Sequence, residues 1–78
     1  MRQAIRYAII ESCMQPSGAY AHTQASYAEE DTARAAFKIA YFAGPGYGII
    51  RGRSLTLCKS YFDNGTYQRE VLDRRDID

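Results

Sequence analysis

The residues in this 78-residue sequence that could perform covalent chemistry are few and lie far apart. His22 is the only histidine, and Cys13 and Cys58 are the only cysteines. A nucleophilic cysteine needs a nearby histidine or a helix N-terminus to stabilise its thiolate, and the strands predicted around the two cysteines offer neither. An enzyme with a subunit-boundary site that uses His22 or a cysteine has no positive support. We therefore predict no catalytic residue and no enzymatic activity.

The sequence also gives no pattern for a metal or a cofactor. The two cysteines are too far apart for a zinc motif. Glu29, Glu30 and Asp31 are adjacent, and neighbouring side chains on a helix diverge by about 100°. The glycines of Gly44–Gly48 follow a predicted helix and precede a predicted strand, which is the reverse of the order in phosphate-binding loops. We predict neither a metal nor a cofactor.

Basic and aromatic side chains in the second half of the chain form the candidate partner site. Arg51 and Arg53 flank a glycine and can present two guanidinium groups to carboxylates or phosphates. Tyrosine and arginine are frequent anchors of protein interfaces, and basic groups among exposed rings also suit single-stranded nucleic acid. The predicted partner-binding residues are Tyr47, Arg51, Arg53, Lys59, Tyr61, Tyr67 and Arg69.

Length and composition favour a binding protein. With 46% hydrophobic and 24% charged residues, the sequence is typical of a folded globular chain. We expect one domain over residues 1–78, with residues 73–78 as a frayed charged tail. So short a chain can barely enclose a ligand pocket of about 300–1,000 Å³. The net charge of +1 argues against a strongly basic nucleic-acid-binding protein.

The N-terminal segment does not resemble a targeting sequence. Arg6 and Glu11 interrupt its apolar stretch, unlike the long apolar run of a signal peptide. No segment reaches the roughly 20 apolar residues needed to cross a bilayer. We expect a cytoplasmic protein with reduced cysteines and no membrane contact.

Two strands are predicted before a single helix. Ala4–Met14 is rich in β-branched and aromatic residues, and its two mixed faces predict a strand inside a sheet. The turn signal at residues 16–18 predicts that Ala19–Ala25 pairs with it as a hairpin. The S-x-x-E pattern that begins at Ser26 predicts the N-cap of a helix. That helix is expected to run to about Ala43, before Gly44.

The helix and a second hairpin complete the predicted fold. The helix places Ala33, Ala36, Phe37, Ala40 and Tyr41 on one face, which we expect to pack on the sheet. Asn64-Gly65 predicts a type I′ turn. The resulting register pairs Phe62 with Tyr67, Lys59 with Glu70, Cys58 with Val71 and Leu57 with Leu72. The element order ββαββ predicts an α+β fold, with a single antiparallel four-stranded sheet and one helix packed on one face.

The uncovered face of that sheet is the predicted place for surface tyrosines. The sequence holds seven tyrosines, more than a thin core can bury. We predict Tyr7 and Tyr41 in the core, and Tyr20, Tyr47, Tyr61 and Tyr67 at the surface.

These features predict a small non-enzymatic protein-interaction module. It would bind a protein partner through a Tyr/Arg-rich sheet face or through the Gly44–Arg53 loop. From its size we expect a phage or mobile-element inhibitor that docks on a larger host complex. The alternative is a nucleic-acid-binding module that uses Arg51, Arg53, Lys59 and Arg69 with exposed tyrosines. An uncovered sheet face also favours a homodimer.

Overall fold

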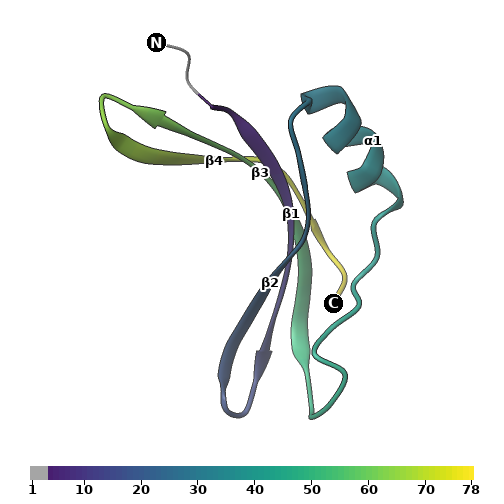
Figure 1. Cartoon of the computed structure of the whole chain (residues 1–78). Helices are drawn as coiled ribbons and strands as arrows, with labels where there is room; N and C mark the ends of the chain where they lie inside the picture. Colours follow the sequence, from purple (N-terminus) through teal and green to yellow (C-terminus); the bar gives the residue numbers. More distant parts are fainter. Residues whose placement is uncertain (1–3) are drawn as a thin grey trace.

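The computed structural model describes residues 4–78 as one sheet and one helix. The elements are β1 (Arg6–Gln15), β2 (Gly18–Tyr27), α1 (Glu30–Ile39), β3 (Arg51–Asp63) and β4 (Thr66–Asp76). Neighbouring strands are antiparallel in the order β2-β1-β3-β4, and α1 packs on one face (Figure 1). The predicted α+β fold is confirmed, and β1 lies inside the sheet as expected.

The core forms between α1 and the two central strands. Successive residues of a strand point to opposite faces, so every second residue of β1 from Tyr7 onwards faces α1. The buried cluster consists of Tyr7, Ile9, Ala33, Phe37, Leu55 and Leu57. Tyr41 was predicted to join this core, but its side chain is 77% exposed. The helix ends before it, and the backbone is already extended at Ala40.

Both predicted ends of the helix are wrong. The N-cap residue is Glu29, with no side-chain capping hydrogen bond. Ser26 instead belongs to β2, pairs with Ala8 and accepts a hydrogen bond from Arg6 Nη2 at 3.1 Å. The β1–β2 ladder therefore takes the residue that the capping pattern assigns to the helix. At the other end the helix stops at Ile39, and the guanidinium of Arg75 donates to the carbonyl oxygens of Phe37 and Ala40 there.

The β3–β4 hairpin follows the predicted turn and most of the predicted register. Asn64 and Gly65 have φ values of 53° and 79°, as a type I′ turn requires. The pairs Phe62–Tyr67, Lys59–Glu70 and Cys58–Val71 are confirmed. The pair Leu57–Leu72 is wrong, because a bulge after Leu57 places it opposite Asp73. The bulge leaves Leu72 to pack against the core.

The C-terminal tail is paired with β3 instead of fraying. β4 extends to Asp76, and the backbone N–H of Ile77 donates to the carbonyl of Arg53 at 2.8 Å. The Arg53 guanidinium also binds the Asp78 carboxylate, with Nη2 to Oδ1 at 2.6 Å. The prediction of a frayed tail over residues 73–78 is therefore wrong, because backbone and ionic contacts both hold this segment.

The sheet is curved, and α1 lies on its convex side. In Figure 1 the tips of the two hairpins bend away from the helix. The face opposite α1 carries no element among residues 4–78. Small side chains occupy much of that face, since Ala8 and Ser12 of β1 lie opposite Cys58 and Ser54 of β3.

Candidate functional site

The seven predicted partner-binding residues do not share one surface. Paired residues of neighbouring strands project to the same side of a sheet. Lys59 pairs with the core residue Tyr7, so it faces the helix side, whereas Arg69 pairs with Ser60 on the opposite side. By the same alternation Arg53, Lys59 and Tyr61 belong to the helix side, and Tyr67 and Arg69 belong to the uncovered face. A register irregularity between Ser12 and Met14 places Arg51 opposite Met14 on the uncovered face, and Tyr47 lies in the loop before β3. The predicted Tyr/Arg-rich sheet face is therefore divided between two faces and a loop.

Two of these basic side chains, Arg53 and Lys59, lie over aromatic rings of the same chain. Arg53 pairs with Asp78 and also stacks on Phe42, with its guanidinium carbon 6.0 Å from the ring centre. Hydrogen bonds from Arg53 hold the pKa of Asp78 below its usual value. The ammonium nitrogen of Lys59 lies 5.6 Å from the ring centre of Tyr61. These contacts make Arg53 part of the fold rather than a free binding group.

The start of β3 and the loop before it form a compact exposed surface. Tyr47 is 75% exposed, Ile49 76% and Met14 49%. A hollow of about 260 Å³ lies among Met14, Gln15, Pro16, Ile49 and Arg51. The side-chain amide of Gln15 donates to the Tyr47 carbonyl at 3.1 Å, which ties the loop to the end of β1. We call Met14, Tyr47, Ile49 and Arg51 the loop-end patch.

Arg51 gives the loop-end patch its charge. Its side chain is exposed and makes no salt bridge within residues 4–78. Met14 lies opposite Arg51 in the β1–β3 ladder, so the cation stands directly beside apolar surface. Tyrosine, methionine and arginine are enriched at protein interfaces, where apolar area and a guanidinium fork act together. The sequence identified Tyr47 and Arg51 by name and included Ile49 only as part of the Gly44–Arg53 loop. It missed Met14, which the fold brings to the same end.

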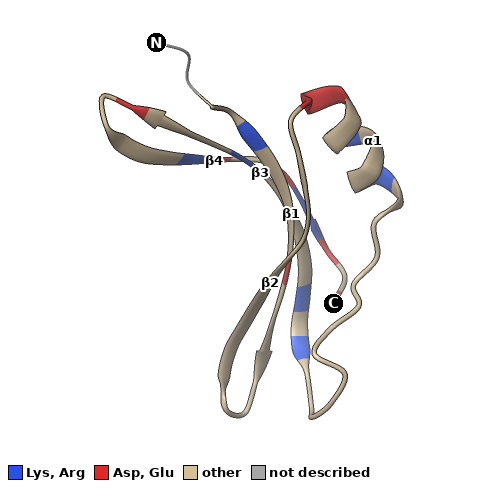
Figure 2. Ribbon diagram, in the orientation of Figure 1, with Lys and Arg blue, Asp and Glu red and all other residues tan. Residues whose placement is uncertain are grey.

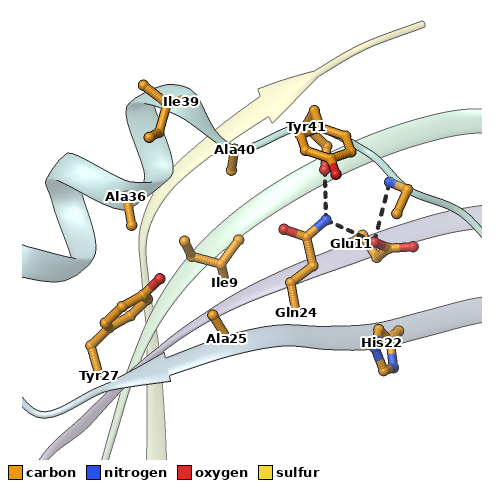
Figure 3. Close-up of a pocket in the computed structure, with 11 residues that line it drawn as sticks. Ile9, Glu11, His22, Gln24, Ala25, Tyr27, Ala36, Ile39, Ala40 and Tyr41 are labelled. Carbon is orange, nitrogen blue, oxygen red and sulfur yellow. Dashed lines mark hydrogen bonds between the residues drawn. The ribbon is translucent and has the colours of Figure 1, made fainter.

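A larger groove separates the end of α1 from β2 (Figure 3). Its volume is about 430 Å³. Ile9 lies in its floor, and small residues such as Ala25 and Ala36 leave it open. The helix side of its rim carries Ile39 and Tyr41, whose side chains are 83% and 77% exposed. We call this hollow the α1–β2 groove.

Glu11 is a buried carboxylate at one end of the α1–β2 groove. Its residue is only 1% exposed. It accepts hydrogen bonds from Tyr20 Oη at 2.9 Å, Gln24 Nε2 at 2.7 Å, the Gly44 N–H at 2.8 Å and the Ala43 N–H at 3.4 Å. Each carboxylate oxygen thus has two donors. The carboxylate fastens the chain after α1 to the sheet.

These hydrogen bonds keep Glu11 ionised. Burial raises the pKa of the carboxyl, but the hydrogen bonds from Gln24, Tyr20 and the two backbone amides lower it by more, and the result lies below the ordinary value. His22 also lines the groove, yet no hydrogen bond joins it to Glu11 among the described residues. Both carboxylate oxygens are occupied by neutral donors, and the lowered pKa makes Glu11 a weak proton acceptor, so the geometry gives it the role of an anchor. In the sequence, Glu11 is recognisable only as a charged residue that follows Tyr7 and Ile9 on the same side of the strand.

The other reactive side chains offer no further site. Cys13 and Cys58 are free thiols that are 4% and 2% exposed. Between residues 4 and 78, no three His, Cys, Asp or Glu side chains come close enough to hold a metal ion. The described part of the chain also contains no helix with the length and apolarity needed to cross a membrane.

Comparison with known protein families, characterised proteins and solved structures finds no match for this chain. Its function must therefore be inferred from its own surfaces. Two of them stand out, the loop-end patch and the α1–β2 groove.

Proposed function

We propose that this chain is a small non-enzymatic protein-interaction module that docks on a larger protein through the loop-end patch. The observation that supports the proposal is the gathering of Met14, Tyr47, Ile49 and Arg51 at one end of the molecule. Met14, Ile49 and Arg51 line a hollow that can accept a side chain of the partner, and the exposed Tyr47 belongs to the same loop. A central aromatic or arginine anchor in such a hollow is the usual source of binding energy at an interface.

The nucleic-acid alternative is less well supported. Single-stranded nucleic acid is bound along a continuous basic groove with stacking rings. The four basic residues of that alternative lie on opposite sides of the sheet, and Arg53 is neutralised by Asp78. The net charge of +1 adds no long-range attraction for phosphates.

A protein that binds a target without catalysing a reaction can act as an inhibitor. In this proposal the module occupies a surface that its target needs for another contact, as a phage or mobile-element inhibitor of a host complex would. The loop-end patch replaces the divided sheet face as the contact surface, and three of its four residues belong to the Gly44–Arg53 loop.

The experiment is affinity capture with two matched variants. Tyr47→Ala/Ile49→Ala truncates the two most exposed apolar side chains of the loop-end patch, and Phe62→Ala/Tyr67→Ala removes a similar area of exposed apolar surface at the far hairpin. From a lysate of cells that carry the gene, the wild type and the far-hairpin variant should recover the same stoichiometric protein, which the loop-end variant should lose. If the loop-end variant still recovers this protein and the far-hairpin variant loses it, the partner binds at the β3–β4 hairpin and the proposal is refuted.

A second measurement addresses nucleic acid directly. Fluorescence anisotropy with a labelled single-stranded oligonucleotide should show no binding at low salt. Binding that weakens steeply with salt and disappears in Arg51→Ala would instead support the nucleic-acid alternative.

A further inference from the structure

The two edges of the sheet differ strongly in charge. β4 forms one edge and has six charged residues among its eleven, whereas β2 forms the other edge and has none among its ten. Figure 2 shows β2 without charged positions. Charged residues and prolines are the common protection of an edge strand against pairing with another chain. β2 contains neither, so nothing in its composition opposes a further strand.

The outer backbone groups of β2 are unpaired in the described part of the chain. Its ladder partners all belong to β1. No other hydrogen bond among residues 4–78 uses a backbone atom of β2. An antiparallel ladder uses alternate residues on each side of a strand. Every second residue of β2 therefore directs its N–H and C=O groups away from the sheet, towards a position that another strand can take.

The α1–β2 groove lies beside this open edge. β2 forms one wall of the groove, and the end of α1 with the following residues forms the other (Figure 3). A strand added to β2 would direct alternate side chains to the helix side, next to Ile39 and Tyr41. It would thus cover the most exposed large apolar side chains at this rim as well as the unpaired backbone.

We propose that the chain forms a two-fold symmetric dimer in which β2 pairs antiparallel with β2 of a second copy. In such a pair every residue near the axis lies close to its own counterpart, so any charged residue there would meet a like charge. β2 has no charged residue along its whole length, so no like charges would meet in this pair. β4 does not, because charged residues occupy more than half of its positions.

The regular part of β2 sets the expected register. A bulge at Gln24 interrupts the ladder with β1, so Ala19–Thr23 is the longest regular stretch beyond the turn. A two-fold axis at Ala21, its centre, places Tyr20 opposite His22 of the second copy on the helix side. These rings would extend over the α1–β2 grooves of both copies.

The dimer would also leave no uncharged strand at an open edge of the sheet. Pairing through β2 makes a sheet of eight strands whose two outer edges are both β4, the charged strand. Both helices lie on the same face, with their exposed C-terminal ends towards the seam. This arrangement differs from a dimer through the uncovered sheet face, which the sequence alone favoured.

Sedimentation equilibrium with two lysine variants tests the proposal. The wild type should sediment at twice the chain mass of 8.8 kDa. Ala21→Lys puts like charges together at the axis and should raise the dimer dissociation constant by about a hundredfold or more. Val71→Lys adds the same charge at an exposed position of β4 and should leave the dimer intact. Circular dichroism confirms that both variants are folded.

Cross-linking gives an independent measurement of the axis. In an Ala21→Cys variant, oxidation should join two copies, because facing residues of an antiparallel pair lie within the Cα separation that a disulfide allows. The wild type, whose cysteines are buried, and Val71→Cys should give no such product. A monomeric wild type overturns the proposal. Loss of the dimer in both lysine variants also overturns it and indicates pairing through the uncovered face.

Discussion

Replacement of Glu11 by glutamine is the most informative test of the fold. The four donors around this carboxylate come from β2 and from the segment after α1. Glutamine has nearly the same shape but only one oxygen, so it can accept two of the four hydrogen bonds. Its NH₂ group then faces the two remaining donors. We expect Glu11→Gln to destabilise the fold and to loosen the segment that carries Ala43 and Gly44.

The size of the effect follows from the two lost hydrogen bonds. A hydrogen bond to a charged group contributes about 1.5–3 kcal/mol net, and a buried donor left unpaired costs about 1–3 kcal/mol. We therefore expect the free energy of unfolding to fall by about 3–5 kcal/mol. A domain of this length has only about 4–12 kcal/mol in total. The variant should lose a large share of its stability.

Urea unfolding followed by circular dichroism measures this loss. Glu70→Gln is the matched control, because Glu70 is an exposed carboxylate and its replacement should leave the transition midpoint unchanged. A Glu11→Gln transition within about 0.5 kcal/mol of the wild type, the usual range for a surface substitution, would refute the anchoring role.

The pH dependence provides a second signature of Glu11. Its pKa in the folded state lies below the ordinary value of 4.5. The ionised carboxylate therefore contributes stability above the unfolded-state pKa, and this contribution is lost as the pH falls through the lower folded-state value. The wild type should lose stability over this acidic range, and Glu11→Gln should lose correspondingly less.

Two further substitutions test other parts of the fold. Arg75→Met keeps a long side chain over Phe37, whose ring centre lies 5.1 Å from the guanidinium carbon, but removes the donors to the last helical carbonyls. It should cost about 1–2 kcal/mol in urea unfolding, and equal stability would exclude the capping role. Gly65→Ala places a side chain at φ 79° and should cost about 1 kcal/mol. An unchanged unfolding midpoint would show that the turn tolerates it.

Patterns within one segment predicted the fold well. Asn64-Gly65 determined the second hairpin because its two positive φ values are a local requirement of the turn. The stripe at Ala33 and Phe37 identified the buried face of the helix, since it depends only on the period of its own element.

Local sequence patterns did not predict the contacts between segments that are distant in the chain. Ser26 has the residue type of a helix cap, but pairing with Ala8 of β1 takes it into a strand. Glu11 receives donors 32 and 33 positions away, which no local pattern shows. The loop-end patch likewise depends on the loop returning to the end of β1, so no local pattern indicates that Met14 belongs to it.

The strand order also determines how the chain can reach its native state. β1–β2 and β3–β4 are hairpins whose pairings close over short turns, so both can form within microseconds. Neither hairpin is stable alone in water. The step that joins them pairs β1 with β3, including the Ser12 and Ser54 hydroxyls 42 positions apart. Closure of that long loop should limit the folding rate, and until it occurs the inner edges of both hairpins remain open to strands of other chains.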